Sequence, residues 1–341
     1  MTMQSSETST MLQLISGFHV SRALYVAAKL GLADLVAGGL HDGPALAAAT
    51  ATDASSLMRV LRLLATVGVF EVDEHERVRL TPLAETLRQD APASLRGWAI
   101  GQLGDEHYMA WGDLLGSVRT GQDAFRRLFG KSPWEHRVEH AASAEEFDAG
   151  MSSFLRAHIE AVINAYPFGR FRRIVDVAGG DGQMLAAILA TCADTSGQVF
   201  EVPHVAERAA RRFGQAGLAA RATALAGSIF DTVPAGADAY LLSRVIHDWA
   251  DADAIAILKN CRLAANPAST LILVERVLPD RMDTTARARA LAASDVNMLV
   301  MTGGRERTEA QYRELLAAAS WRLTRLIATA TALSLVEAAP A

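Results

Sequence analysis

Hydrophobic and polar positions follow a helical spacing through the first half of the chain and form strand-like runs in the second half. Helical stretches at residues 14–30 and 53–66 precede two short β-type runs, at 68–72 and 77–81, which flank the polar residues 73–76. Two such runs around a polar turn are typical of a β-hairpin. Residues 11–96 are therefore predicted to be mainly helical and to end in a small hairpin, the pattern of a winged helix.

The pattern of apolar and polar residues stays helical up to residue 166 and changes after it. Residues 97–166 have a helical pattern and carry large apolar side chains, so we expect a helical linker that covers a pocket. From residue 167 to the end, β-type runs at 173–177, 198–202, 237–242 and 270–274 alternate with helical patterns at 183–191, 206–216 and 251–265. This alternation indicates an α/β fold with a doubly wound parallel sheet.

Composition narrows the class of partner. The 341 residues suit two domains, and a net charge of −5 gives no basic surface for nucleic acid or an anionic membrane, so a small molecule is the expected partner. Cys192 and Cys261 are far apart and lack metal-ligand spacing, which fits a reducing cytoplasm and predicts neither a disulfide framework nor a zinc site. Residues 1–10 are Ser/Thr-rich and are expected to be a flexible tail, and no apolar run is long enough to span a membrane.

A glycine-rich loop follows the first strand of the second half. The strand 173–177 runs into the residues 178–182 (AGGDG) and then into a helical pattern. Glycines permit a close approach of the backbone to a ligand, and the helix N-terminus offers unpaired N–H groups. The dinucleotide fingerprint and the phosphate loop both match poorly. The next strand ends at Glu201, whose carboxylate either binds both hydroxyls of a ribose or is a surface acid.

Five segments, in order, resemble the plant-type and actinomycete family of small-molecule O-methyltransferases. They are 175–182 (VDVAGGDG), 200–205 (FEVPHV), 227–230 (GSIF), 242–249 (LSRVIHDW) and 303–308 (GGRERT), and they span almost the whole catalytic half. The resemblance implies a winged-helix dimerisation domain and a Rossmann-like class I methyltransferase domain. It also implies a homodimer, S-adenosyl-L-methionine as donor, S-adenosyl-L-homocysteine as product, no metal, and a small aromatic acceptor.

The same resemblance assigns residues to the donor site, with two departures from the family pattern. The methionine part of the donor is expected at Asp176, Ala178, Gly179, Gly180 and Gly182, and the ribose at Glu201 and Val202. The adenine is expected at Ser228, Ile229 and Phe230, and the donor's polar tail at Ser243. Ala178 replaces a glycine, a small change if its φ stays negative. Ser228 replaces an Asp at the adenine amine, so we expect a weaker contact or one through water.

His247 is the residue that the resemblance implies as catalytic base, bracketed by the acids Glu275 and Glu306. A histidine can accept a phenol proton as the methyl group is transferred, and an acid at its other ring nitrogen fixes the tautomer. Asp248 either assists or simply begins a helix. Candidates for the acceptor pocket, each of which could instead be a core residue, are His107, Trp111, Met151, Phe154, Asn297, Met298 and Met301.

Two other functions remain open from the sequence. Relatives in this family use the bound donor for hydroxylation, decarboxylation or pericyclic steps, and Ser228 keeps that alternative open. A DNA-binding regulator is suggested by the winged-helix pattern and by Arg59 and Arg62. The negative charge argues against DNA, and the helix 53–66 is apolar enough to be interpreted as a dimer interface instead.

Overall fold

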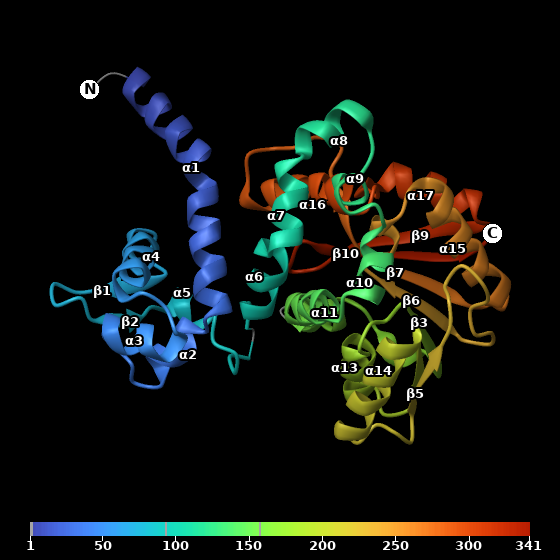
Figure 1. Ribbon diagram of the computed structural model, residues 1–341. Coiled ribbons are helices and arrows are strands. Elements are labelled where there is room, and N and C mark those ends of the chain that lie inside the picture. The colour runs from blue at the N-terminus through green and yellow to red at the C-terminus, as the bar shows by residue number, and fades with distance from the viewer. Residues whose placement is uncertain (1–2, 93, 157) are drawn as a thin grey trace. The chain divides into compact units, whose positions relative to one another are not determined.

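The computed structural model describes residues 3–92, 94–156 and 158–341, and it divides into two compact units (Figure 1). The first unit comprises the described residues up to 108 together with the segment 141–156. The second comprises 109–140 and 158–341. No helix in the described part of the chain combines the length and apolarity that a membrane crossing requires.

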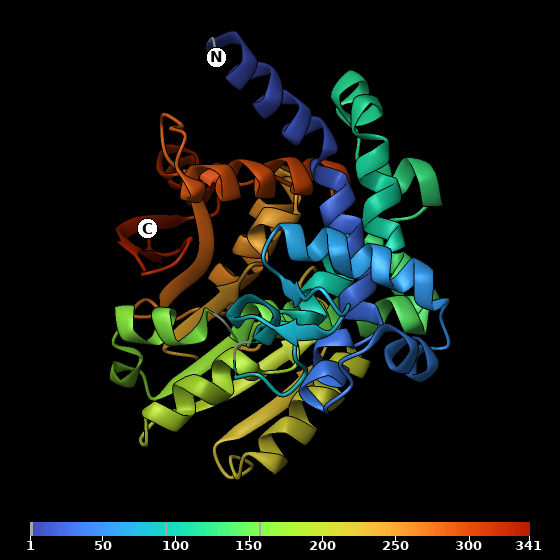
Figure 2. The ribbon, with the colours of Figure 1, turned by 90° about the vertical axis from the view of Figure 1, so that its left-hand side faces the viewer.

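The first unit is a small helical domain with the expected hairpin. Its elements are α1 (Met3–Lys29), α2 (Leu32–Ala37), α3 (Gly43–Thr50), α4 (Ala54–Thr66), β1 (Phe70–Val72), β2 (Val78–Leu80), α5 (Pro82–Glu85), α6 (Arg96–Leu103) and α11 (Ala141–Arg156), while α7 (Asp105–Gly112) spans the boundary. The antiparallel β1 and β2 pair Phe70 with Leu80 and lie beside α4 (Figures 1 and 2). The Asp53 carboxylate caps α4 by accepting the Ser56 N–H at 2.8 Å.

The apolar face of α4 forms the core of this unit. Leu57, Met58, Leu61 and Leu64 are buried against the other helices and the hairpin. These four side chains therefore do not face a partner subunit, because the chain's own core covers them, whereas Leu63 on the same helix is exposed. A run of exposed large apolar side chains lies on α1, at Met11, Leu12, Leu14, Ile15 and Phe18.

Residues 1–10 were expected to be a flexible tail, but their described part, from Met3, belongs to α1. The Ser/Thr composition is compatible with a helix because the hydroxyls bond back to earlier carbonyls. Thr10 donates to the Ser6 carbonyl at 2.9 Å, and Ser16 donates to the Leu12 carbonyl at 2.8 Å. A Ser/Thr-rich composition alone is therefore not enough to predict an irregular segment.

The helical region 97–166, expected as a single linker, is divided between the two units. Helices α6 and α11 meet at Gly97, Gly101 and Gly150, and a Cβ at Gly97 would lie 2.7 Å from the carbonyl oxygen of Ala149. Only glycines permit this close approach, so α11 returns to the first unit after residues 109–140 have joined the second.

The second unit is a twisted sheet covered by helices. Its elements are α8 (Leu114–Thr120), α9 (Ala124–Phe129), α10 (Pro133–Glu139), α12 (Ile159–Ala165), η1 (Phe168–Arg170), β3 (Arg173–Val177), α13 (Gln183–Thr191), β4 (Ser196–Glu201), α14 (Pro203–Gln215), β5 (Ala222–Ala226), β6 (Ala239–Ser243), η2 (Ile246–Asp248), α15 (Asp251–Ala264), β7 (Thr270–Leu278), α16 (Ala286–Met301), β8 (Arg307–Thr308), α17 (Glu309–Ala318), β9 (Trp321–Ala328) and β10 (Leu333–Pro340).

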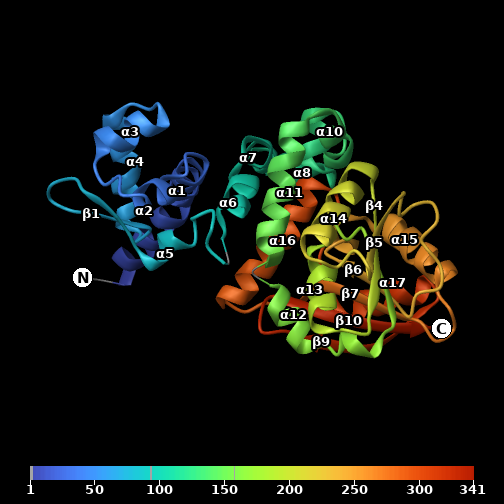
Figure 3. The same ribbon diagram turned by 90° about the horizontal axis from the view of Figure 1, so that it is seen from below.

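The strand order is β5-β4-β3-β6-β7-β10-β9, with β8 paired to β7. The first five strands are parallel, and β10 runs antiparallel to both of its neighbours. Helices α13 and α14 lie on one face of the sheet and α15 and α17 on the other (Figure 3). The chain order reverses between β3 and β6, and ligands of doubly wound sheets bind beyond the carboxyl ends of the strands at such a switch point.

A buried carboxylate ties the antiparallel end of the sheet to the segment before β3. Glu337 on β10 accepts a bidentate pair from Arg325, with Nε–Oε1 at 2.9 Å and Nη2–Oε2 at 2.6 Å. It also accepts hydrogen bonds from Thr324, Arg170 and the Tyr166 hydroxyl. The Arg325 hydrogen bonds, with those of its other donors, lower the Glu337 pKa to about 2 even though burial opposes the shift.

Glu337→Gln is expected to lower the free energy of unfolding by about 2–4 kcal/mol, because it leaves two arginines without their buried anion. The folded pKa lies below the ordinary value of 4.5, so this contribution is complete above pH 4.5 and is lost as the pH falls toward 2. Urea unfolding of both proteins across this range measures it, with the exposed Glu85→Gln as control. A deficit of the same size as that of the control would contradict the assignment.

Candidate active site

The loop after β3 has a left-handed backbone at three positions. Gly180 and Gly182 have φ of 57° and 76°, and Ala178 has φ of 54°. The condition for the alanine to be a small change, a negative φ, is therefore not met. A non-glycine residue in this region costs about 1–2 kcal/mol, which the loop compensates by packing and by the Ala178 N–H, which donates to the Phe200 carbonyl at 2.8 Å.

Asp176 lies directly beneath this loop. Its side chain is fully buried, and neither carboxylate oxygen has a hydrogen-bond partner among the residues described. A Cβ at Gly179 would come within 2.5 Å of the carboxylate, so only glycine fits above it. Burial, together with Glu201 and Asp181, raises the Asp176 pKa to about 8. A buried acid without a partner under an open backbone loop is suited to a cationic ligand.

The ends of the neighbouring strands complete this edge of the sheet. Glu201, at the end of β4, accepts the Gly180 N–H at 3.1 Å and the Val202 N–H at 2.8 Å, which orients its carboxylate toward the glycine loop. Ser243, at the end of β6, has a buried hydroxyl oxygen without a partner among the described residues. The adjacent strands β3 and β6 thus carry buried polar atoms without described partners, beside the glycine loop, and these atoms can bind a polar or charged ligand.

The segment after β5 is a tight turn beside a recess of about 240 Å³ that Ser228 and Asp231 help to line. Ser228 Oγ accepts the Phe230 N–H at 3.2 Å, so one of its lone pairs is already engaged in the turn. The Ile229 carbonyl accepts a hydrogen bond from Asn260 at 2.9 Å. The exposed Phe230 ring and the Trp249 ring form a T-shaped pair with their centroids 4.8 Å apart. This pairing leaves an aromatic surface next to the turn.

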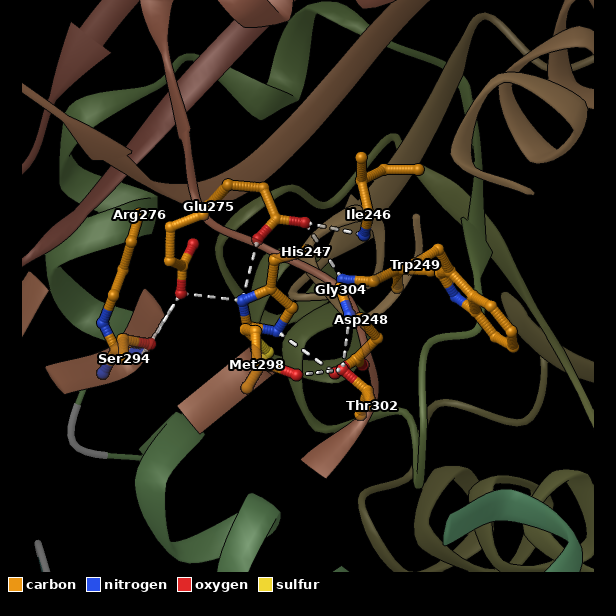
Figure 4. A network of polar contacts seen from close by, with 12 residues as sticks. Ile246, His247, Asp248, Trp249, Glu275, Arg276, Ser294, Met298, Thr302 and Gly304 are labelled. Atoms are coloured by element: carbon orange, nitrogen blue, oxygen red, sulfur yellow. Dashed lines mark hydrogen bonds and ion pairs between the residues drawn. The ribbon is translucent and has the colours of Figure 1, made fainter. Parts of the chain in front are cut away.

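His247 lies in η2, just beyond β6, and is 1% exposed. Its Nδ1 is 3.0 Å from Glu306 Oε1 and 3.6 Å from Glu275 Oε2, and its Nε2 is 3.8 Å from Asp248 Oδ1 (Figure 4). The fold thus brings together the three residues that the sequence motifs single out, although they are far apart in the chain. The hydrogen bond to Glu306 assigns the Nδ1 proton and leaves Nε2 as the basic nitrogen.

The two glutamates differ in what they bond. Glu275 Oε1 accepts the N–H groups of Val245 and Ile246 at 3.1 and 2.9 Å, so this acid holds the turn that carries His247. Burial raises its pKa. Glu306 faces strong burial too, but His247 and the hydroxyl of Ser294 lower its pKa to about 2. Glu306 is therefore the ionised partner of the imidazole, and Glu275 is a positioning residue.

The acids around His247 raise its pKa. Burial alone would lower it, but Glu306, Glu275 and Asp248 together raise it to about 9. A charged imidazole is thus much more stable in this site than in water. The site is built to receive a proton.

Residues that sequence reasoning missed fix the backbone of the same turn. The fully buried Arg307 donates to the carbonyls of Ile246 at 3.0 Å and Trp249 at 2.9 Å. Gly304 packs against the backbone from His247 to Trp249 so closely that a Cβ there would overlap it. Both residues belong to the GGRERT segment, so the signal was present, but only the structure shows that this segment clamps the base.

The residues expected in the acceptor pocket separate into two groups. In the second unit, Trp111 Nε1 donates to Asn297 Oδ1 at 2.9 Å. Met298, the residue after Asn297, is buried, and Met301 lies in a core cluster with Phe125.

The other three belong to the first unit. His107 is buried with a ring nitrogen 3.4 Å from Gln102, Phe154 packs on Trp98 at 4.7 Å between centroids, and Met151 is half-buried.

The described residues contain one group of side chains close enough to share a metal ion, and it is the set His247, Glu275 and Glu306 itself. Hydrogen bonds account for its geometry. Nδ1 donates to Glu306, and Glu275 accepts two backbone N–H groups. The arrangement therefore matches an oriented imidazole base.

Comparison with known proteins agrees with this geometry. Residues 12–90 match the O-methyltransferase dimerisation domain, and residues 111–322 match the O-methyltransferase domain. The chain is 40% identical over 333 residues to the phenazine O-methyltransferase of Lysobacter antibioticus, covering 98% of this chain and 96% of that protein. It is 37% identical over 304 residues to the aclacinomycin 10-hydroxylase of Streptomyces purpurascens, covering 88% and 81%.

A solved structure is similar over nearly the whole chain. It is an O-methyltransferase of neocarzinostatin biosynthesis, in complex with S-adenosylmethionine and 2-hydroxy-5-methyl naphthoic acid, at a TM-score of 0.82 and 35% identity, covering 94% of this chain and 96% of that one. The matched dimerisation domain makes the protein a homodimer. With both domains matched and relatives of this identity and coverage, the chain belongs to the O-methyltransferase family and is an S-adenosyl-L-methionine-dependent enzyme.

Proposed function

We propose that this enzyme methylates a phenolic hydroxyl of a small aromatic secondary metabolite, with His247 as general base. The observation that carries the proposal is the 3.0 Å contact between His247 Nδ1 and Glu306, which leaves Nε2 as the proton acceptor at the carboxyl edge of the sheet. The names of the relatives support the substrate class, since they act on a phenazine and on naphthoic acids.

The donor site is proposed to hold S-adenosyl-L-methionine along Asp176, the loop 178–182, Glu201 and Val202, the segment 228–230, and Ser243. When bound, this group supplies a methyl carbon activated by its sulfonium. Asp176 would face positive charge with a carboxylate that has no other described partner. Glu201 is already turned toward the loop and can accept the ribose hydroxyls. The adenine contact at Ser228 stays weaker than an Asp would make it.

In the proposed mechanism, His247 Nε2 accepts the proton of the acceptor hydroxyl as its oxygen bonds to the methyl carbon. Glu306 holds the Nδ1 proton and stabilises the imidazolium, while Glu275, Gly304 and Arg307 fix the turn. Proximity and alignment then lower most of the barrier. Trp111 and Asn297, hydrogen-bonded to one another, are proposed to line the acceptor side with Met298.

The raised pKa of His247 suits a phenol. A base near pKa 9 is a much better match for a phenolic proton, near pKa 10, than an unperturbed histidine at about 6.5. The cost is that only about one enzyme molecule in a hundred carries the neutral imidazole at pH 7.

The hydroxylase among the relatives defines the main alternative, in which the donor is used without methyl transfer. The oriented imidazole base favours methylation here, because a proton acceptor opposite a methyl donor is what the transfer needs. The first unit also supports dimerisation over DNA binding. The exposed apolar residues of α1 are proposed to form the subunit interface, and the free thiols of Cys192 and Cys261 fit a cytoplasmic location.

His247→Ala is expected to lower kcat by about 10²–10⁴-fold, because the hydroxyl proton loses its acceptor. Donor binding, measured by calorimetry, is expected to stay within about twofold of the wild-type value, since His247 is not proposed to touch the donor. His204→Ala, an exposed histidine on α14, is the matched control. Wild-type turnover by His247→Ala would remove the base assignment.

The pH profile provides a second test. Below pH 9 the imidazole of the free enzyme is mainly protonated, so kcat/KM for a phenolic acceptor is expected to rise about tenfold per pH unit and to level near pH 9. Initial rates with a buffered series from pH 6 to 10 measure this. A plateau already reached at pH 7 would show that the buried acids do not raise the basicity of His247.

The two acids are expected to differ in their effects. Glu306→Gln removes the anion that holds the Nδ1 proton, so kcat should fall by about 10²-fold or more. Glu275→Gln keeps an oxygen that can accept the N–H groups of Val245 and Ile246, so kcat should fall by only about tenfold. Steady-state kinetics on both variants, with thermal unfolding as a check, tests the division; equal losses would argue against it.

A further inference from the structure

A chain of buried polar contacts continues from His247 beyond Glu306. Glu306 Oε1 accepts both His247 Nδ1, at 3.0 Å, and Ser294 Oγ, at 2.6 Å. Ser294 Oγ in turn accepts Arg276 Nη1 at 2.6 Å, and the same Nη1 is 3.9 Å from Glu306 Oε1 (Figure 4). The hydroxyl proton of Ser294 must therefore point at Glu306, because the guanidinium can only donate. The order of donors along the chain is fixed.

Three separate elements contribute to this chain. Arg276 comes from β7, Ser294 from α16, and Glu306 from the segment that enters β8. Arg276 and Ser294 are each 8% exposed and Glu306 is 2% exposed. A guanidinium buried beside two acids costs desolvation energy that a purely structural contact could avoid with apolar side chains. The fold nevertheless places it behind the carboxylate that faces the base.

The two acids beside His247 provide an internal comparison. Glu275 accepts only backbone N–H groups, and its pKa is raised by burial. Burial opposes ionisation of Glu306 too, but His247, followed by the Ser294 hydroxyl and Arg276, lowers its pKa to about 2. Side-chain donors on the side away from the imidazole add to the effect of His247 on Glu306. Among the described residues, a hydrogen-bonded relay runs from the Arg276 guanidinium through the Ser294 hydroxyl to this carboxylate.

We propose that Arg276 and Ser294 are positioning residues that hold the Glu306 carboxylate against Nδ1, so that the proton of neutral His247 stays on Nδ1 and the Nε2 lone pair faces the acceptor. This role rests on the proposed function of His247 as base. Without the relay, the Glu306 carboxylate is free to turn away from Nδ1. The single ring proton of the neutral imidazole can then reside on Nε2, and that nitrogen can no longer accept the proton of the substrate hydroxyl. The charged groups that face this site from the surrounding elements are Arg244, Asp248, Glu275, Arg276, Asp295, Glu306 and Arg307.

The test reads the ring tautomer directly and needs no acceptor substrate. Histidine labelled with ¹⁵N is followed by NMR in the homodimer at pH 10, where the ring is neutral, and the His247 signals are assigned with His247→Gln. The wild-type enzyme is expected to carry the proton on Nδ1. Ser294→Ala is expected to show a substantial Nε2–H population and about a tenfold lower kcat, with KM and donor binding unchanged. Ser294→Thr, which keeps the hydroxyl, should restore both.

Arg276→Met is expected to act in the same direction as Ser294→Ala, with Arg276→Lys as the matched variant that keeps the charge. If Arg276→Met does not fold, Ser294→Ala decides alone, since it removes one oxygen. Retention of the wild-type tautomer in Ser294→Ala would overturn the relay. Full turnover by His247→Ala would instead overturn the base assignment, so the two failures are distinguishable.

Discussion

The active site depends on one buried hydrogen bond, that between His247 and Glu306 at 3.0 Å. A charged pair in the interior is stable only if each charge is surrounded by partners, and much of the local structure supplies them. Glu275 and Arg307 hold the turn that carries the imidazole, and Gly304 brings the chain of Glu306 against that turn. The parallel sheet brings these elements to its carboxyl edge, near the point between β3 and β6 where the chain order reverses.

Much of the fold is predictable because its strands are buried on both faces. β3, β6 and β7 contain continuous apolar runs, which are the signature of a covered parallel sheet, and β4 contributes the apolar pair Val199 and Phe200; all four strands were expected. β5 was missed because it is a short edge strand, mostly exposed, in which Ala alternates with Thr223 and Leu225. The hairpin of β9 and β10 was missed because the buried acid Glu337 interrupts its apolar pattern. The partners of Glu337 are Thr324 and Arg325 across the hairpin and the distant Tyr166 and Arg170, and no local pattern reveals this pairing.

The site was predictable in its members and not in their roles. Family-like motifs named His247, Glu275 and Glu306, but only geometry separates the acid that bonds the imidazole from the acid that holds its turn. At Ala178 the local residue preference misleads, since alanine ordinarily avoids a positive φ and the packing of the loop overrides that preference. Ser294 carries no motif at all, and its place behind Glu306 follows from how α16 packs on β7.

The basicity of the His247 imidazole is set by three surrounding acids, whose effect on its pKa outweighs that of burial. Titration of its ring nitrogens by NMR in the resting homodimer tests this most directly, because the measurement requires neither donor nor acceptor. The account predicts a midpoint near pH 9. A midpoint at or below about 6.5, the ordinary value for histidine, would contradict it, because burial would then outweigh the acids.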